Sequence, residues 1–492
     1  MRRSTAVTVL MVLTWLGFAM PASAATAQQV DRVVVIGVPG LRWDDVSEAR
    51  TPALARMQRD GASGLLSVKT AAPRDCAAAG WLTLGAGNRV DPAGDEPARC
   101  STALPDASSL PAEVAANAER REGAVPGLLA RALRRGGSCV DALGPGAELG
   151  AADLSGAVGV SGAAEPCPVL LRSADLTTVD AIVGAELDRR KPGHVVLVVG
   201  LSELGSQTPH LHVALALGPG FARGELVSAS TRRPGYVQLV DVAPTLLALQ
   251  GLTAPPEMIG EPWRSSGARP TLAVLRDGDR QAGAQRGVTV PFFVVLCGVQ
   301  LVLLLPALWR RWWRTAQAVA LSGVTALGAS YVANLVPWWR AGSPLLAVLV
   351  LTTAGALVLT GLAMLGRGVL SRAGLACGMV AAVVTVDLLT GASLQLSSVA
   401  GYSPLVAGRF AGIGNVAFGV LAAAVLLAAA ATRRAAVAAL TALVVVVDGA
   451  PQWGSDVGGV LALVPAYAVL VLLLSGRAAS LGRVAVAAVT GE

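Results

Sequence analysis

Long apolar runs fill the second half of the chain, and they limit its architecture more than any other feature. A helix of about 20 predominantly apolar residues crosses a bilayer core, whereas an open sheet there would leave its backbone groups unpaired. The run at 435–447 is short by itself and must carry Asp448 and its neighbours into the headgroup region. We therefore predict an all-α polytopic transmembrane bundle of about seven helices over residues 288–492. The seven runs are 288–308, 316–336, 344–365, 373–389, 412–431, 435–447 and 457–474.

The arginines of this half predict its orientation. Nine of them fall in alternate connections between the runs, and only Arg340 and Arg409 fall in the others. Cytoplasmic loops of membrane proteins carry the excess of basic residues, so we expect the carboxyl end in the cytoplasm and the preceding half outside. The same scatter of basic residues excludes a nucleic-acid partner, which would need them clustered on one folded face.

The first residues have the organisation of a secretory signal peptide. Arg2 and Arg3 precede an apolar stretch at 6–20, and the small residues of 22–24 follow. A basic start, a short apolar stretch and small residues are typical of a cleaved export signal. We assign residues 1–27 to it, with an uncleaved anchor helix as the alternative. The next segment is therefore extracytoplasmic, which agrees with the arginine pattern.

Residues 28–252 have an α/β pattern. Short runs rich in valine at 33–36, 195–199 and 213–217 alternate with stretches of helical character at 126–135 and 174–189. Runs that are apolar at nearly every position fit strands covered on both faces, as in a parallel sheet between helices. We predict a doubly wound α/β domain here. Residues 253–287 are rich in Pro, Gly and Arg without a sustained period, and we predict a linker or a loosely packed edge.

Four cysteines lie in the domain predicted to be exported, and two others lie within apolar runs. An even number of exported cysteines favours disulfides. Three pairings are possible, and proximity in the sequence favours Cys76 with Cys100 and Cys139 with Cys167. A zinc site built from the same four cysteines is the competing interpretation, although their spacing lacks the closely paired ligands typical of such sites.

Five segments in a fixed order carry a family resemblance. They are VVVIGVPGLRWDDV, WLTLGAGNRV, HVVLVVGLSELG, HLHVALALGPGF and LVDVAPTLLALQGL, and they span most of residues 30–252. Together they resemble the alkaline phosphatase superfamily. The whole chain resembles uncharacterised actinobacterial membrane proteins that join such a domain to a multi-span region.

The resemblance implies a two-metal hydrolase, but the metal-binding positions depart from the family pattern. Active members hold two divalent metals with Asp and His ligands around a Ser or Thr nucleophile, which attacks a phosphate or sulfate ester. Where the family places an Asp before Gly-Leu-Arg, this chain has Val38 and Pro39, and where the family has Asp-His-Gly, it has the residues 200–203, GLSE. We therefore expect that the site has lost its metals and that the protein needs no cofactor. Zinc or manganese is expected only if an atypical site exists.

Some residues near these positions remain candidates for chemistry. His210 and His212 have the spacing of two residues on one strand face, which makes them the candidate metal ligands. Arg42 is a candidate for substrate binding at the carboxyl ends of the strands, where ligands bind in doubly wound sheets. The candidate catalytic residues are Asp45, Asp75, Thr83, Ser202 and Glu203. Each has a structural alternative as a cap, turn or core residue.

Polar residues recur at one depth of the membrane half. Acidic side chains in membrane spans are costly and are usually functional, and irregular backbone at that depth is tolerated only when it is buried or lines a wet cavity. We predict an outward-facing pocket that binds an anionic headgroup, a cation or a proton, and a simple interfacial position is the alternative. The candidate residues are Asp387, Gln395, Arg409, Asn415, Asp448 and Asp456.

These observations lead to three functional hypotheses for a multi-pass protein of the cell envelope membrane. In the leading one, a non-catalytic exported domain serves a membrane half that handles or transports an envelope component. In the second, the exported domain is a metal-dependent phospho- or sulfo-ester hydrolase or transferase that acts on a lipid-linked substrate. In the third, the chain is a structural partner of another envelope enzyme. The lipid bilayer is a partner in all three.

Overall fold

The valine-rich runs form the centre of a mixed sheet. The computed structural model describes residues 30–94, 100, 104–159, 166–204, 208–267, 269–431 and 434–474, so the predicted signal peptide lies outside the described residues. The nine strands of the sheet are β1 (Arg32–Val38), β2 (Ala62–Ser67), β3 (Val140–Leu143), β4 (Val169–Ser173), β5 (His194–Gly200), β6 (His212–Leu217), β7 (Gly224–Val227), β8 (Tyr236–Gln238) and β9 (Arg264–Ser266).

The sheet is not parallel throughout, and this differs from the all-parallel arrangement that the apolar runs suggested. Its order is β3-β4-β1-β5-β6-β2-β7-β9, with β8 paired to β2. Strands β3, β4, β1 and β5 are parallel, whereas β6 is antiparallel to both of its neighbours and β9 is antiparallel to β7. A strand covered on both faces is apolar throughout in either direction, so the sequence pattern does not encode strand direction.

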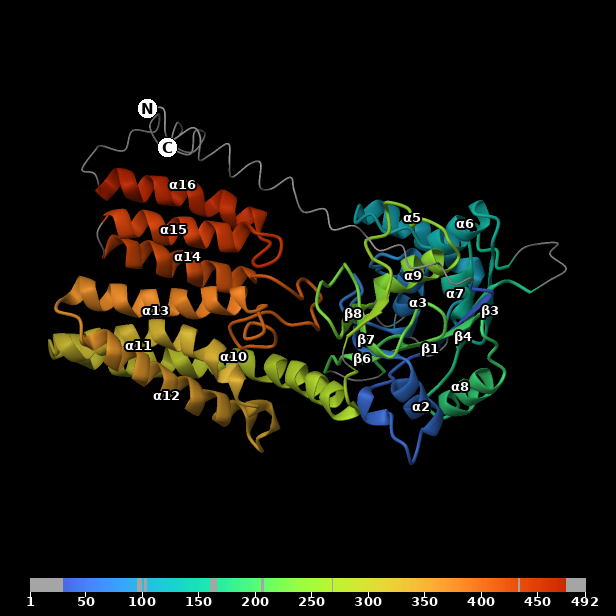
Figure 1. Cartoon of the computed structure of the whole chain (residues 1–492), viewed down its shortest axis with the longest axis horizontal. Helices are drawn as coiled ribbons and strands as arrows, with labels where there is room; N and C mark the ends of the chain where they lie inside the picture. The colour runs from blue at the N-terminus through green and yellow to red at the C-terminus, as the bar shows by residue number, and fades with distance from the viewer. Residues whose placement is uncertain are drawn as a thin grey trace.

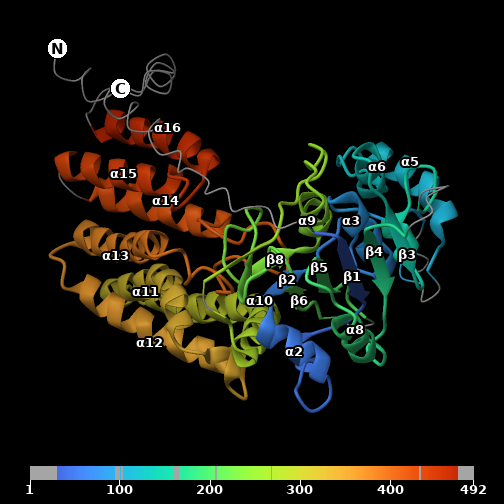
Figure 2. The same cartoon turned by 45° about the vertical axis from the view of Figure 1, so that its right-hand side comes forward.

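Helices cover both faces of the sheet (Figure 2). The side chains of β1 alternate between two cores, with Val33 and Val35 in one and Val34 and Ile36 in the other. The first core is covered by α3 (Ala77–Ala86), α6 (Leu128–Arg135), α7 (Ala147–Ala151) and α9 (Val242–Leu249). The second is covered by α2 (Pro52–Asp60), α8 (Val179–Asp188) and the start of α10 (Leu272–Trp309). Helix α5 (Leu110–Arg120) lies outside the first layer. The two-sided α/β architecture predicted from the sequence is confirmed.

Both predicted disulfide pairs are present. Cys76 is bonded to Cys100, and Cys139 to Cys167. The first pair ties the start of α3 to the chain that precedes α5, and the second ties the start of β3 to the start of β4. Disulfides persist in oxidising compartments, so these two are consistent with an extracytoplasmic domain.

A helical region follows the sheet domain. Four of its helices are long and apolar enough to cross a membrane by length and composition, namely α10, α11 (Trp313–Val332, continuing to Leu335), α12 (Pro344–Met364) and α13 (Val369–Leu389). Three shorter apolar helices coincide with the last three predicted spans, namely α14 (Asn415–Ala430), α15 (Arg434–Gly449) and α16 (Val457–Leu474). Figure 1 shows these helices side by side, with α10 reaching from the bundle to the sheet domain.

The segment predicted as a linker contains regular structure. Strand β9 adds to the sheet edge, and α10 begins at Leu272 and continues without interruption into the apolar run. Its first four turns bury Leu275, Asp279 and Ala282 against the sheet domain and the segments around it. These three positions have helical spacing. The sequence did not show a helical period of apolar residues, because one of the buried positions is an aspartate among glycines and arginines. The same helix therefore belongs to both halves of the chain.

Candidate functional site

The carboxyl ends of β1, β5 and β2 and the start of β6 lie at one edge of the sheet, and they bring most of the predicted residues of the sheet domain together. Arg42 follows β1, Glu203 follows β5, and Asp75 follows β2. His210 and His212 come at the start of β6, which runs antiparallel to β5 and so begins where β5 ends. An isolated bridge between Arg42 and His212 closes the loop after β1 over this strand.

His210 is held between Arg42 and a residue of α10. The Arg42 guanidinium donates to His210 Nε2 at 3.1 Å, and His210 Nδ1 lies 3.1 and 3.2 Å from the two carboxylate oxygens of Asp279. Asp279 also accepts a hydrogen bond of 2.7 Å from the backbone N–H of Leu211. The hydrogen bond to Asp279 raises the pKa of His210, although burial and the Arg42 charge act against it.

His212 and Glu203 form a second buried pair. His212 Nδ1 donates to the Leu41 carbonyl at 3.0 Å, so this nitrogen carries a proton. Its Nε2 lies 3.2 Å from Glu203 Oε1 without the alignment of a hydrogen bond. Glu203 Oε1 accepts instead from the backbone N–H of His210 at 2.6 Å. His212 Nε2 and Glu203 Oε2 are thus buried without a hydrogen-bond partner among the described residues.

Asp75 is neutralised by a lysine. Asp75 Oδ1 accepts from Lys69 Nζ at 3.0 Å and from the backbone N–H and hydroxyl of Thr70 at 2.8 and 2.9 Å. The Arg89 guanidinium also interacts electrostatically with Asp75; burial lowers the pKa of Arg89, and the negative charge of Asp75 opposes that shift.

The remaining catalytic candidates have structural contacts. Asp45 Oδ2 caps its own turn by accepting from the Arg42 backbone N–H at 2.9 Å. Thr83 is fully buried in α3, and its hydroxyl accepts from the Val90 N–H. Ser202 is also fully buried, and its hydroxyl donates to the carbonyl of the next residue. The structure therefore brings Arg42, Asp75, Glu203 and the two histidines to one edge and leaves these three in supporting positions.

The acids and histidines at this edge do not fit a two-metal arrangement. Both ring nitrogens of His210 already have protein partners, one of them a guanidinium, and Asp75 faces a lysine. A metal ligand must present a free lone pair, and cations beside it disfavour a further positive ion. The described residues contain no group of three or more His, Cys, Asp or Glu that could hold a metal ion. His212 Nε2 and Glu203 Oε2 are buried atoms of this edge without a hydrogen-bond partner among the described residues.

In the helical region, Asp387 is the centre of a hydrogen-bond network at the carboxyl end of α13. Its side chain is 1% exposed. It accepts from the Leu394 N–H at 2.7 Å and from Gln395 Nε2 at 3.0 Å. Gln395 is fully buried, and its side-chain oxygen accepts from the Gly414 N–H at the start of α14. Asp387 and Gln395 thus fix the fold of the long loop 390–414.

Asp448 and Asp456 lie together in the turn between α15 and α16. Asp448 is fully buried, and neither carboxylate oxygen has a hydrogen-bond partner in the described part of the chain. Asp456 Oδ1 caps α16 by accepting from the Gly459 N–H at 3.1 Å. Arg409, within electrostatic reach of Asp448, donates to the Gly454 carbonyl at 3.3 Å. Asn415, the last of the predicted residues, is exposed at the start of α14.

Three arginines of the sheet domain dock it onto the loops that carry these residues. Arg233 donates to the carbonyls of Gly391, Ala392 and Phe410 at 3.3 to 3.5 Å. Arg232 donates to the Ser455 hydroxyl at 2.8 Å and to the carbonyl of residue 451, and Arg89 donates to the carbonyl of residue 407. Figure 1 shows the connections after α13 and α15 lying between the bundle and the sheet domain.

Sequence reasoning missed the residues that join the two halves. Asp279, Arg232 and Arg233 lie in segments without a recognisable motif. Arg89 lies within WLTLGAGNRV but was not singled out there. The only available signal was the spacing of Leu275, Asp279 and Ala282 in α10, which follows a helical period when the aspartate is counted as buried.

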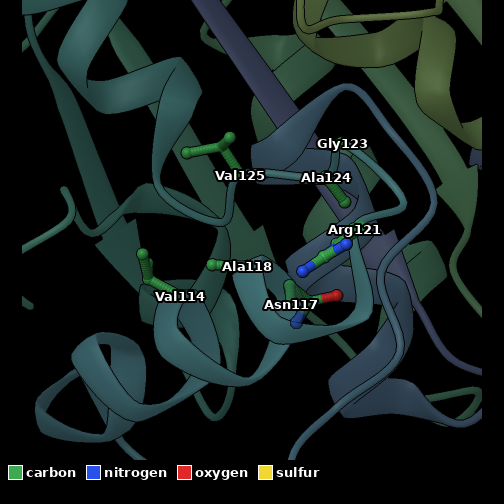
Figure 3. Close-up of a pocket in the computed structure, with 7 residues that line it drawn as sticks. All are labelled: Val114, Asn117, Ala118, Arg121, Gly123, Ala124 and Val125. Atoms are coloured by element: carbon green, nitrogen blue, oxygen red, sulfur yellow. The ribbon is translucent and has the colours of Figure 1, made fainter.

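A pocket of about 240 Å³ lies elsewhere in the sheet domain. Figure 3 shows its lining on α5 and the connection that follows, with Asn117 and Arg121 as its polar members. None of the predicted site residues lines this pocket, so we assign it no role in function.

Comparisons with known proteins add no assignment. The chain matches no protein-family model, no curated protein and no solved structure.

Proposed function

We propose that this chain is a multi-pass envelope membrane protein whose exported α/β domain is a non-catalytic cap on a membrane half that handles or transports an envelope component. The exported domain would be a relative of the alkaline phosphatase superfamily that has lost its metal site. The membrane half would have about seven spans, with its carboxyl end in the cytoplasm and the polar residues Gln395, Arg409 and Asp448 at its outer end.

The observation that carries this proposal is the docking of the exported domain. Arg232 and Arg233 bind the two loops that hold the polar residues of the membrane half, and α10 runs from one half into the other without a break. At the edge where a superfamily member would hold metals, Asp279 from α10 binds His210 instead. The edge that would carry catalysis therefore serves as an attachment surface.

The expected ligand is an anionic headgroup. Arg409 belongs to the loop 390–414, which is irregular backbone at the end of the bundle, and its half-buried guanidinium lies beside Asp448 and the Gly454 carbonyl. A guanidinium binds phosphate oxygens through two parallel hydrogen bonds, which suits a lipid or a lipid-linked envelope component with a phosphate near its polar end.

Lipid retention by the purified full-length chain tests the proposal. The protein is reconstituted in nanodiscs with equal phosphatidylglycerol and phosphatidylcholine, released into detergent, and its bound lipid measured by native mass spectrometry. We expect retained phosphatidylglycerol, and a loss of about tenfold in Arg409→Gln, which corresponds to one charged hydrogen bond.

Arg340→Gln is the matched control, because Arg340 is exposed at the same end of the bundle and pairs only with Asp277 on the described surface. It should leave retention unchanged. Equal retention in wild type and Arg409→Gln, or equal loss in both variants, would contradict a specific headgroup site.

One observation favours a second candidate, a metal-dependent ester hydrolase or transferase. His212 Nε2 lies 3.2 Å from Glu203 Oε1, and His212 Nε2 and Glu203 Oε2 are buried without hydrogen-bond partners among the described residues, as atoms of two ligands of an atypical site would be. Zinc and manganese content of the full-length chain, together with hydrolysis of an aryl phosphate, tests it. Stoichiometric metal and turnover that are both lost in His212→Gln would replace the non-catalytic proposal.

A further inference from the structure

The turn between α15 and α16 holds a pair of carboxylates that converge on one small residue. A methyl group on Gly459 would lie 2.5 Å from Asp448 Oδ2 and 2.9 Å from Asp456 Oδ2. The two side chains therefore approach the same face of the start of α16, and only a glycine leaves them room. Two carboxylates this close repel each other when both are ionised.

Burial makes this pair more than an acidic surface cluster. Asp448 is fully buried, and neither of its oxygens accepts a hydrogen bond from any described residue. An anion without donors in such a place is costly, whereas a proton or cation between the two acids removes the cost. Asp456 is half-buried, so a proton from water can reach the pair through it.

The charged groups around the pair come from three elements. Arg409 of the loop 390–414 lies within electrostatic reach of Asp448 and is held on the Gly454 carbonyl. Arg232 of the exported domain donates to Ser455, the residue directly before Asp456. On α13, Asp387 faces its own donors, Leu394 and Gln395. Of these two arginines, Arg409 is the one whose charge acts on Asp448, so we count it as the cation that balances the pair.

The charge balance favours a proton over a metal ion. Two carboxylates and one guanidinium carry one net negative charge, which a single proton neutralises and a divalent cation exceeds. Calcium takes six to eight oxygen ligands and magnesium six, whereas the described residues here hold no group of three acidic or metal-ligating side chains. Two carboxyl groups this close can share one proton, which removes the repulsion between two ionised carboxylates.

We propose that Asp448 and Asp456 share one exchangeable proton, and that taking up this proton releases Arg409 to bind an anionic headgroup. The proton comes from the outer water, and one O–H bond forms while no other covalent bond changes. With the pair fully ionised, its double negative charge holds the guanidinium. With one proton bound, half of that charge is gone, and the guanidinium is available to a phosphate. The headgroup part rests on the proposed function, and the shared proton does not.

The first experiment observes the proton directly. Infrared difference spectra of the full-length protein in nanodiscs are recorded between about pH 5 and about pH 8, a range in which ordinary surface carboxyls are already ionised. We expect a protonated carboxyl carbonyl band in the wild type that is absent from both Asp448→Asn and Asp456→Asn. The shared proton would be overturned if the band is unchanged in both variants or if the wild type lacks it.

The second experiment links the proton to the headgroup. Phosphatidylglycerol retention in the wild type should be about tenfold greater at about pH 5 than at about pH 8, because two ligands that favour the same state promote each other's binding. Asp448→Asn imitates the protonated residue and should retain the lipid equally at both values. Wild-type retention that does not change with pH would overturn the coupling.

The outcomes separate this inference from the proposed function. If Arg409→Gln retains lipid normally while the infrared band behaves as expected, the headgroup site is wrong and the proton site stands. If sodium, magnesium or calcium raises the melting temperature of the wild type but not of Asp448→Asn, the pair is a metal-cation site and the shared proton is overturned. Asp456→Asn keeps the test decisive if Asp448→Asn does not fold.

Discussion

The contact between Asp279 and His210 joins the membrane helix α10 to the sheet, and Asp279→Asn should open that junction. Asp279 is 6% exposed and accepts from His210 and from the Leu211 N–H. An asparagine keeps one acceptor but turns a donor toward His210 or Leu211. Hydrogen bonds to charged groups contribute about 1.5 to 3 kcal/mol each, so the local opening equilibrium should shift about 10- to 150-fold.

The effect should depend on pH. The pKa of His210 is raised in the folded protein, chiefly by the hydrogen bond to Asp279. A group of this kind stabilises the fold fully below its unfolded pKa of about 6.5, and the contribution is lost as the pH rises through the higher folded value. The difference between Asp279→Asn and wild type should therefore be larger at about pH 5.5 than at about pH 8.5.

Hydrogen exchange of the full-length protein is the appropriate assay. Peptides that cover β6 and the first turns of α10 are compared between variant and wild type at the same pH, so that intrinsic exchange rates cancel. Asp277→Asn is the matched control on the same helix, because its partner Arg340 is exposed and such pairs contribute about 0 to 1 kcal/mol. Unchanged exchange in Asp279→Asn, or a larger effect at high pH, would refute the reasoning.

Three further predictions follow from particular contacts. Gly459→Ala should displace Asp448 and abolish its infrared band. Gly458→Ala should leave the band unchanged, because the nearest atom to a methyl group on Gly458 lies 3.5 Å away. Equal spectra for the two variants would be inconsistent with a close approach of Asp448 to Gly459. Replacing the Cys139–Cys167 disulfide, which spans 28 residues, by serines should destabilise the exported domain by about 3 to 4 kcal/mol, seen as faster trypsin cleavage; unaltered cleavage would contradict this. Asp387→Asn should lower the free energy of unfolding by about 1 to 3 kcal/mol, because asparagine is a weaker hydrogen-bond acceptor, while expression is kept. An unchanged melting temperature would exclude the hydrogen-bond network around Asp387.

Much of the fold was accessible from the sequence because burial leaves a plain pattern. Strands covered on both faces are apolar at nearly every position, so β1, β5 and β6 coincide with the predicted runs. The cysteine spacing favoured the two disulfides that the structure contains. Strand direction did not follow, because it depends on connections and not on the strands' own residues.

The candidate site was only partly accessible, because its contacts join distant segments. Asp279 meets His210 across 69 residues, and Arg232 meets Ser455 across 223. Such contacts depend on how α10 places one half against the other, and no local spacing encodes that. The acids of the apolar half could be singled out from the sequence because a charge in an apolar segment is conspicuous. The structure was needed to show that Asp387 accepts hydrogen bonds whereas Asp448 accepts none from the described residues.

The central claim is that the sheet domain is fixed onto the loops of the helical region, and thiol cross-linking measures this most directly. In a background with Cys297→Ser and Cys377→Ser, cysteines replace Arg232 and Ser455, whose side chains are in contact. A protease site is inserted into the connection between α12 and α13, so that the two cysteines fall on separate fragments after cleavage.

We expect a short bis-maleimide to keep the fragments together on a denaturing gel in intact membranes. The control pair replaces Arg135, at the exposed end of α6 on the far side of the sheet domain (Figure 1), together with Ser455, and it should not cross-link. Equal cross-linking of the two pairs, or none for the contact pair, would contradict a docked exported domain.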